Sequence, residues 1–125
     1  MAKPKFTFGI PSFVNAVYQA VFGKNVPDKF LSEREFYIEG MEKGNVTSRD
    51  VIINILLSAY VYDKYDTDEK FLKLCYNVMG VKTVPQEEFE KWLNRFETRT
   101  RGGVIKGLFL TEYWEKFCDK YEVKT

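Results

Sequence analysis

The chain contains the same pattern twice, and this internal repeat is the strongest constraint on its fold. The segment FVNAVYQAVFGKNVP, residues 13–27, returns in altered form as FLKLCYNVMGVKTVP, residues 71–85. Further on, VIINILLSAYVY, which begins at Val51, matches VIKGLFLTEYWE, which begins at Val104. The repeat predicts two similar units, at about 12–65 and 68–121, each of which needs the other to complete a core.

The apolar residues inside each unit follow helical rather than strand spacing. The first helix is expected to stop at Gly23 and its counterpart at Gly80, because glycine is a common residue just beyond helix C-termini. Pro27 and Pro85 then stand at the start of a second helix in each unit, where a missing amide hydrogen costs nothing. The repeated segments therefore record how a helix is packed, stopped and followed by the next.

Short polar residues predict further helix starts. Thr47 or Ser48 is expected to cap a third helix over about 48–62, the most apolar helix of the first unit. Asp66, together with Glu69, is expected to cap the fourth helix, which opens the second unit.

Length and composition fit one folded domain. A chain of 125 residues with 45% hydrophobic and 17% aromatic residues is large enough to bury a core without disulfide or metal support. Few residues alternate with period two over any length. We therefore predict an all-α fold of about six helices, arranged in two similar three-helix units that pack as a single helical domain over 1–125.

Charge and hydropathy exclude two classes of partner. Nineteen basic and eighteen acidic residues give a net charge of +1, which argues against nucleic acid as the main partner. The longest apolar run is interrupted by Asn54 and Ser58 and is too short for membrane insertion. The N-terminal residues lack the continuous apolar stretch of a secretory signal. The chain is therefore expected to be either cytoplasmic or a domain excised from a longer secreted or cell-surface protein.

The chain contains two cysteines, Cys75 and Cys118, and no histidine. Both cysteines lie in aromatic-rich helical patterns and are expected to be buried, reduced thiols; the alternatives are a disulfide between them or a reactive thiol. Without histidine, the usual nucleophile triad and a histidine-ligated metal centre cannot be built. The acidic cluster over 63–69 lacks the central glycine of a calcium loop. We predict no catalytic residues, no metal and no cofactor.

The segment RFETRTRGGVIKG is the first candidate for a binding site. Arg95, Arg99 and Arg101 lead into Gly102 and Gly103, just before the predicted sixth helix. Free amides at a helix N-terminus and nearby guanidinium groups attract anions, so the segment is expected to hold a phosphate, a sulfate, or an acidic sugar or side chain. The alternative is a basic loop whose flexible glycines join two helices.

Aromatic residues near the ends of the units offer a second candidate surface, because sugar rings stack on exposed aromatic faces. Most aromatic residues of the chain have helical core spacing and are expected to be buried. Trp114 lies near a unit end, and we include it among the candidate binding residues. The other aromatic residues that could expose a face are Trp92, Tyr60, Tyr62, Tyr65 and Tyr113.

The repeated segment also resembles known helical modules. The resemblance is carried by a helix of the form Phe-Val-x-x-x-Tyr, a glycine turn, a proline-led second helix and an apolar third helix, in FVNAVYQAVFGKNVPD and GNVTSRDVIINILLSAYVY. These residues resemble the bacterial helical repeat domain of unknown function numbered four thousand two hundred and fourteen, and they are similar to the phycobilisome linker domain. The resemblance covers 12–65 well and 70–118 weakly. It implies a non-catalytic helical module, often found in tandem or fused to surface, secreted or glycan-related proteins.

Three functional hypotheses follow. The leading one is a non-catalytic helical binding or scaffolding module, part of a larger protein, that mediates a protein–protein interaction. The first alternative is a carbohydrate-recognition module of a surface or secreted protein, which requires exposed Trp92, Trp114 or tyrosine side chains along a cleft. The second is an enzyme or enzyme subunit, which requires a cleft where carboxylates and arginines converge with shifted pKa values.

Overall fold

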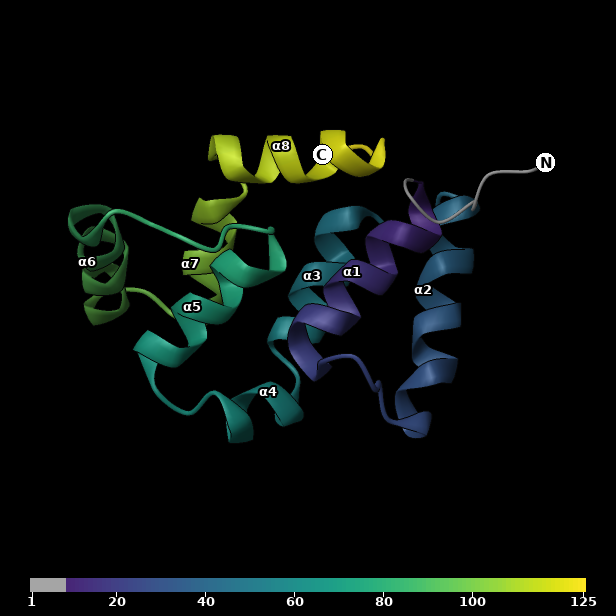
Figure 1. Cartoon of the computed structure of the whole chain (residues 1–125), viewed down its shortest axis with the longest axis horizontal. Coiled ribbons are helices and arrows are strands. Elements are labelled where there is room, and N and C mark those ends of the chain that lie inside the picture. Colours follow the sequence, from purple (N-terminus) through teal and green to yellow (C-terminus); the bar gives the residue numbers. More distant parts are fainter. Residues whose placement is uncertain (1–8) are drawn as a thin grey trace.

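The computed structural model describes residues 9–125, which are built from helices and contain no strand (Figure 1). The all-α prediction is therefore confirmed. The expectation that the N-terminal residues do not form a secretory signal falls largely on residues 1–8, which lie outside the described residues. Among residues 9–125, no helix has the length and apolar character needed to cross a bilayer. In chain order the elements are α1 (Ile10–Phe22), η1 (Asp28–Phe30), α2 (Leu31–Glu42), α3 (Ser48–Leu56), α4 (Ala59–Lys64), α5 (Asp68–Val78), α6 (Gln86–Asn94), η2 (Arg95–Glu97), α7 (Arg101–Leu108) and α8 (Glu112–Tyr121).

Residues 9–125 form eight α helices and two short 3-10 helices, whereas about six helices were predicted. The segment over 48–62 does not continue as one helix. α3 ends at Leu56, and Ser58 begins α4, where its hydroxyl accepts a hydrogen bond from the amide of Val61 (3.4 Å). Thr111 stands in the same place between α7 and α8. The Ser58 hydroxyl thus caps the new helix, whereas the Thr111 hydroxyl donates a hydrogen bond to the carbonyl of Leu108 (2.7 Å) and does not cap α8.

Helices α1 to α4 and α5 to α8 follow the same order along the two repeated segments. Gly23 and Gly80 follow the ends of α1 and α5 with φ of 84° and 76°, a left-handed conformation that favours glycine, as predicted. Pro27 directly precedes η1 and Pro85 directly precedes α6, again as predicted. The grouping of the helices into two units stays a prediction from the repeat.

The predicted cap of α3 is confirmed. The Thr47 hydroxyl accepts a hydrogen bond from the amide of Asp50 (3.1 Å), and the Asp50 carboxylate accepts one from the amide of Thr47 (3.0 Å). This reciprocal pair satisfies two amides that the helix itself leaves free. The start of α3 is therefore set by residues next to one another in the sequence.

The predicted cap of α5 is wrong, because Thr67 rather than Asp66 begins this helix. The Thr67 hydroxyl accepts a hydrogen bond from the amide of Lys70 (3.1 Å). Asp66 instead pairs with the ammonium group of Lys70 (3.2 Å), and Glu69 pairs with that of Lys73 (3.5 Å). These carboxylates form exposed ion pairs along the outer side of the helix and do not cap it.

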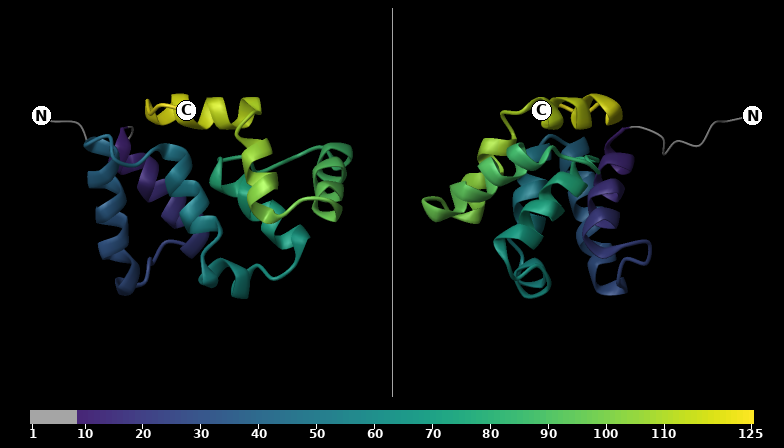
Figure 2. Two further views of the ribbon diagram at one scale, coloured as in Figure 1. Left: turned by 180° about the vertical axis from the view of Figure 1, so that it is seen from behind. Right: turned by 60° about the vertical axis from the view of Figure 1, so that its left-hand side comes forward.

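Helices α1 and α5 pack against each other and supply much of the core. α1 also packs against α2 and α8, and α5 packs against α6. Phe13 and Tyr18 of α1, and Phe71 and Leu72 of α5, are fully buried. Figures 1 and 2 show α2 and α6 at opposite ends of the long axis, with α1 and α5 between them.

Helix α8 crosses one side of the molecule and closes the core over α1 (Figure 2). The Phe13 ring meets three rings of α8, with centroid distances of 6.3 Å to Trp114, 5.2 Å to Phe117 and 6.4 Å to Tyr121. The amide of Gly9 donates a hydrogen bond to the carbonyl of Tyr121 (2.7 Å). The last helix is thus joined to the first.

The residues after α8 hold the start of α3. The Ser48 hydroxyl donates a hydrogen bond to the carbonyl of Lys124 (2.6 Å), and Arg49 donates one to the carbonyl of Thr125 (2.7 Å). The indole N–H of Trp114 donates to the same Thr125 carbonyl (3.3 Å). These bonds connect segments that are distant in the sequence, and they fix α8 relative to α3.

Replacing Phe71 by alanine should lower the free energy of unfolding by about 3–5 kcal/mol, the usual cost of emptying a buried phenylalanine site. The matched control is Phe36→Ala on α2, because Phe71 is fully buried whereas Phe36 is 65% exposed. The control should change the free energy of unfolding by less than about 1 kcal/mol. Urea unfolding followed by circular dichroism measures both. Equal losses in the two variants would contradict this assignment of the core.

Thr67→Ala should lower the free energy of unfolding by about 1 kcal/mol, because the amide of Lys70 loses its partner. Asp66→Ala removes an exposed ion pair and should cost at most about 0.5 kcal/mol. The same urea titrations compare the two neighbours directly. A larger loss for Asp66→Ala than for Thr67→Ala would show that the aspartate caps α5 after all.

Candidate functional site

The arginine segment predicted to bind anions is largely used for packing within the molecule. The guanidinium group of Arg95 lies 3.8 Å from the centre of the Trp92 ring. Gly107 lies beneath the same ring, because a Cβ atom added there would come within 3.1 Å of it. Arg99 is exposed. Of these two arginines, Arg95 is thus committed to the contact between α6 and α7.

Arg101 is held between two aromatic rings. Its guanidinium group lies 4.5 Å from the centre of the Tyr62 ring and 4.3 Å from that of Phe71. Its Nη2 atom donates a hydrogen bond to the backbone carbonyl of Tyr65 (2.7 Å). The charge is directed toward α4 and α5, where a guanidinium stacks favourably on aromatic faces. Arg95 and Arg101 therefore contact different aromatic rings, and the anion site expected in this segment stays a prediction.

Gly102 and Gly103 lie inside the first turn of α7, so the expectation that they precede the helix as a flexible loop is wrong. The Thr100 hydroxyl caps this helix and accepts a hydrogen bond from the amide of Gly103 (3.1 Å). One of the amides expected to attract an anion is thereby already satisfied.

The two tryptophans are buried. Trp114 is fully buried and Trp92 is 8% exposed. The expectation that Trp114 presents a free face is wrong, because its ring packs against Phe13 and Phe109, with centroid distances of 6.3 and 4.7 Å. Neither indole is available for a sugar to stack on.

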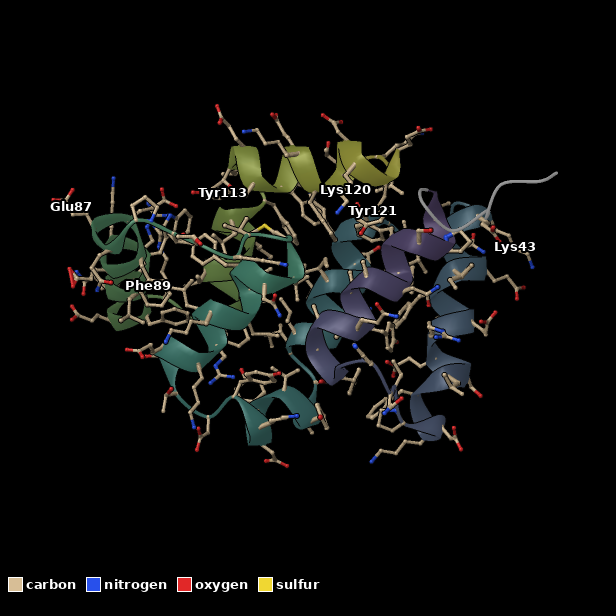
Figure 3. All side chains as sticks on the ribbon, viewed as in Figure 1. Lys43, Glu87, Phe89, Tyr113, Lys120 and Tyr121 are labelled. Atoms are coloured by element: carbon tan, nitrogen blue, oxygen red, sulfur yellow. The ribbon has the colours of Figure 1, made fainter. Side chains whose placement is uncertain are left out.

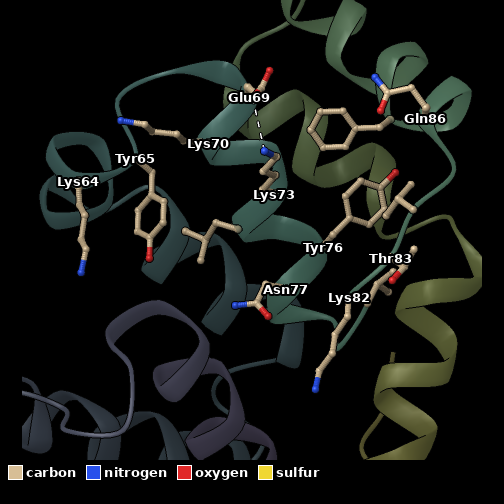
Figure 4. Close-up of a pocket in the computed structure, with 14 residues that line it drawn as sticks. Lys64, Tyr65, Glu69, Lys70, Lys73, Tyr76, Asn77, Lys82, Thr83 and Gln86 are labelled. Carbon is tan, nitrogen blue, oxygen red and sulfur yellow. Dashed lines mark hydrogen bonds and ion pairs between the residues drawn. The ribbon is translucent and has the colours of Figure 1, made fainter.

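A hollow of about 930 Å³ lies along the outer side of α5 (Figure 4). Its walls are the end of α4, the loop from Gly80 to Pro85 and the start of α6. Apolar side chains, including Leu74, Val81 and Val84, cover much of its surface. We call this hollow the α5 groove. It is lined by Lys64, Tyr65, Glu69, Lys70, Lys73, Leu74, Tyr76, Asn77, Val81, Lys82, Thr83, Val84, Gln86 and Phe89.

Four lysines stand around the α5 groove, namely Lys64, Lys70, Lys73 and Lys82 (Figure 4). The side chains of Lys70 and Lys73 are 60% and 65% exposed even though each has a carboxylate partner. Exposed pairs of this kind are weak and can exchange partners readily. The groove therefore combines an apolar surface with a positively charged rim.

A second hollow of about 310 Å³ lies between α1, the end of α5 and α8, and we call it the α8 hollow. It shares Asn77 and Val81 with the α5 groove, so the two adjoin. Figure 3 shows Tyr113, Lys120 and Tyr121 along the side of α8 that faces the rest of the molecule. The α8 hollow is lined by Ala16, Asn77, Val78, Met79, Gly80, Val81, Tyr113, Lys116, Phe117, Lys120 and Tyr121.

In the first half of the chain, aromatic rings fill the region beside the end of the first helix. Phe22, Phe30 and Tyr60 form a cluster in which Phe22 lies 4.4 Å from Phe30 and 4.6 Å from Tyr60, between ring centroids. Phe30 and Tyr60 are 5.7 Å apart. This packing leaves little space between the helices.

In the second half, the residues aligned with that cluster are Met79, Glu88 and Tyr113. The Glu88 carboxylate accepts hydrogen bonds from the hydroxyls of Tyr113 (2.8 Å) and Tyr76 (3.2 Å). Glu88 stands in the place of Phe30, and its carboxylate joins α5, α6 and α8. Met79 and Tyr113 line the α8 hollow, whereas Glu88 lines neither hollow.

The tyrosine hydroxyls that donate to glutamates have raised pKa values. Burial is the main cause for Tyr76, and the neighbouring Glu88 adds to it. The hydrogen bond to Glu88 is the main cause for Tyr113. In the first half, burial and the hydrogen bond to Glu33 (2.6 Å) raise the pKa of Tyr18. These hydroxyls stay protonated at neutral pH and act as hydrogen-bond donors.

The two cysteines are free and buried, which confirms the expectation of reduced thiols over a disulfide. Burial raises the pKa of Cys75 and raises that of Cys118 to about 11. A protonated, inaccessible thiol is a poor nucleophile. Within residues 9–125, no group of three or more acidic or cysteine side chains is placed to hold a metal ion.

Comparison of the chain with protein-family models, curated protein sequences and solved structures finds no match. The resemblance to the bacterial helical repeat and to the phycobilisome linker domain stays a prediction. No relative adds information about the site, so its geometry is the basis for its function.

Sequence reasoning missed the α5 groove. Lys70 and Lys73 are three residues apart, a spacing that places both on one side of a helix and could have signalled a basic face. Lys64 and Lys82 are brought beside them by the turn into α5 and by the loop after it. That approach depends on tertiary structure and leaves no pattern in the sequence.

The stability of the protein should fall as the pH rises above 10, the ordinary pKa of tyrosine, in part because of Tyr76. Its pKa is raised on folding, so its contribution is complete below pH 10 and is lost as the pH rises further. Tyr76→Phe removes this proton site, and its free energy of unfolding should fall less steeply over the alkaline range. Urea unfolding at a series of pH values measures the slopes. Parallel curves for Tyr76→Phe and wild type would refute the assignment.

Proposed function

We propose that this protein is a non-catalytic helical binding module, of a kind that serves as part of a larger scaffolding protein, and that the α5 groove holds a segment of a protein partner. The observation that supports the proposal is one concave surface that pairs apolar side chains such as Leu74 and Val84 with a polar rim. Binding sites in proteins commonly combine these two features.

The burial of the tryptophans favours a peptide segment over a sugar. A carbohydrate-recognition module needs exposed aromatic faces, and Trp92 and Trp114 are both in the core. Within the α5 groove, the Tyr76 ring packs against Phe89 and Tyr113, with centroids 6.3 and 5.6 Å apart. Small apolar side chains of a partner segment can contact the edges of these rings.

The chemistry of the groove favours binding over catalysis. Its carboxylate, Glu69, is paired with Lys73 (3.5 Å) on the exposed rim. The Tyr76 hydroxyl is held by Glu88 and has a raised pKa, so it is a hydrogen-bond donor rather than a base at neutral pH. A catalytic site needs an acid or base whose pKa lies near the working pH. The groove side chains are better suited to holding a ligand.

A random peptide library displayed on phage tests the proposal by selection on the purified protein. Asn77 lies where the two hollows adjoin, so Asn77→Trp should fill the site. We expect the selected peptides to bind this variant about tenfold more weakly than wild type, or worse, in fluorescence anisotropy titrations.

The matched control is Asn94→Trp, since Asn94 is an exposed residue at the end of α6 that does not line either hollow. It should leave the affinity of the selected peptides unchanged. Enrichment of no peptide, or equal binding to wild type and Asn77→Trp, would rule out the α5 groove as the binding site.

A further inference from the structure

The α5 groove and the α8 hollow form one continuous concave surface, because both are lined by Asn77 and Val81. The part on α8 adds two more lysines, Lys116 and Lys120, which are one helical turn apart. We call this continuous surface the combined groove.

The charge of the combined groove is strongly one-sided. Six of the nineteen basic residues line the combined groove. Of the eighteen acidic residues, only Glu69 is among the described side chains that line it. The net charge of the whole chain is +1, so this excess is local. Helix α8 also carries Glu112, Glu115 and Asp119, but none of them lines the groove. The lysines that line it are Lys64, Lys70, Lys73, Lys82, Lys116 and Lys120.

Lys70 and Lys73, the two groove lysines on α5, have no basic counterparts in the first half of the chain. The residues of α1 aligned with Lys70 and Lys73 are Ser12 and Asn15. A fold shared by both halves does not require lysine at these positions. Lys70 and Lys73 are therefore particular to the half of the chain that carries the α5 groove.

The surface between the lysines favours a protein segment over nucleic acid. Single-stranded nucleic acid binds basic grooves by stacking its bases on exposed aromatic faces. Tyr76 is 2% exposed, and neighbouring rings pack against it. Val81 and Val84, which are only partly buried, offer small apolar contacts instead.

We propose that the combined groove binds an acidic segment of a partner protein, in which aspartate and glutamate side chains face the lysine rim and apolar side chains contact Val81 and Val84. This inference rests on the proposed function and adds the chemistry of the partner. Complementary charge would speed the encounter and select against basic segments, while the apolar contacts would supply most of the affinity.

The test is the composition and charge dependence of the peptides that the displayed library yields. We expect the selected peptides to be enriched in aspartate and glutamate around one or two apolar residues, and to bind more weakly as salt is raised. Lys82→Glu/Lys116→Glu reverses one charge in each part of the combined groove and should weaken their binding by about tenfold.

The matched control is Lys24→Glu/Lys106→Glu, which makes the same change in net charge at exposed positions outside the combined groove. It should alter the affinity less than twofold or so. Circular dichroism and urea unfolding of both double variants establish that they are folded.

The outcomes separate the two proposals. Peptides that respond to Asn77→Trp but are not acidic, or that bind Lys82→Glu/Lys116→Glu as tightly as wild type, would overturn the acidic partner and leave the peptide groove standing. Peptides insensitive to Asn77→Trp would overturn both. Preferential binding of single-stranded DNA or of anionic phospholipid vesicles, lost equally in Lys82→Glu/Lys116→Glu, would overturn the choice of a protein partner.

Discussion

The packing of α1 against α5 is the contact on which the other helices depend. α2 is placed by its contact with α1, α6 by its contact with α5, and α8 returns to α1 from the far end of the chain. Each of the two central helices can bury only part of its circumference against its neighbours. On α1 the remaining space near the C-terminus is filled by Phe22 and the rings around it. Near the C-terminus of α5, Met79 stands in the place of Phe22 and lines the α8 hollow.

The exchange of a ring cluster for a hydrogen-bonded carboxylate explains how an open surface is tolerated. Glu88 accepts hydrogen bonds from Tyr76 and Tyr113, so directional bonds hold three helices where apolar packing does so in the first half. Such networks are effective when the buried hydroxyls are satisfied. Departures from local packing rules often mark sites of function. The walls of the groove can thus be kept in place without filling the space between them.

Short-range sequence signals predicted much of the fold. The errors arose where contacts between distant segments determine the structure. Gly23 and Thr47 act through their own backbone or their nearest amides, so their roles could be read from the sequence. The break at Ser58 interrupts an apolar segment without glycine or proline, and periodicity alone does not reveal it. Arg101 looked like a free charge because the rings that hold it, Tyr62 and Phe71, come from other helices. The lysines of the groove converge for the same reason.

The position of α8 also has a consequence for synthesis of the chain. Phe13 is among the first described residues, yet three of its ring contacts come from α8 near the other end of the sequence. Helices α2 and α5 can pack against α1 before α8 does, but the Phe13 ring stays incompletely covered until α8 has been synthesised and has docked. Contacts between such distant segments form slowly, and nascent intermediates expose apolar surface meanwhile. The walls of the α5 groove come from α4, α5, α6 and the loop between α5 and α6, so they can form early, whereas the α8 hollow exists only after α8 has docked.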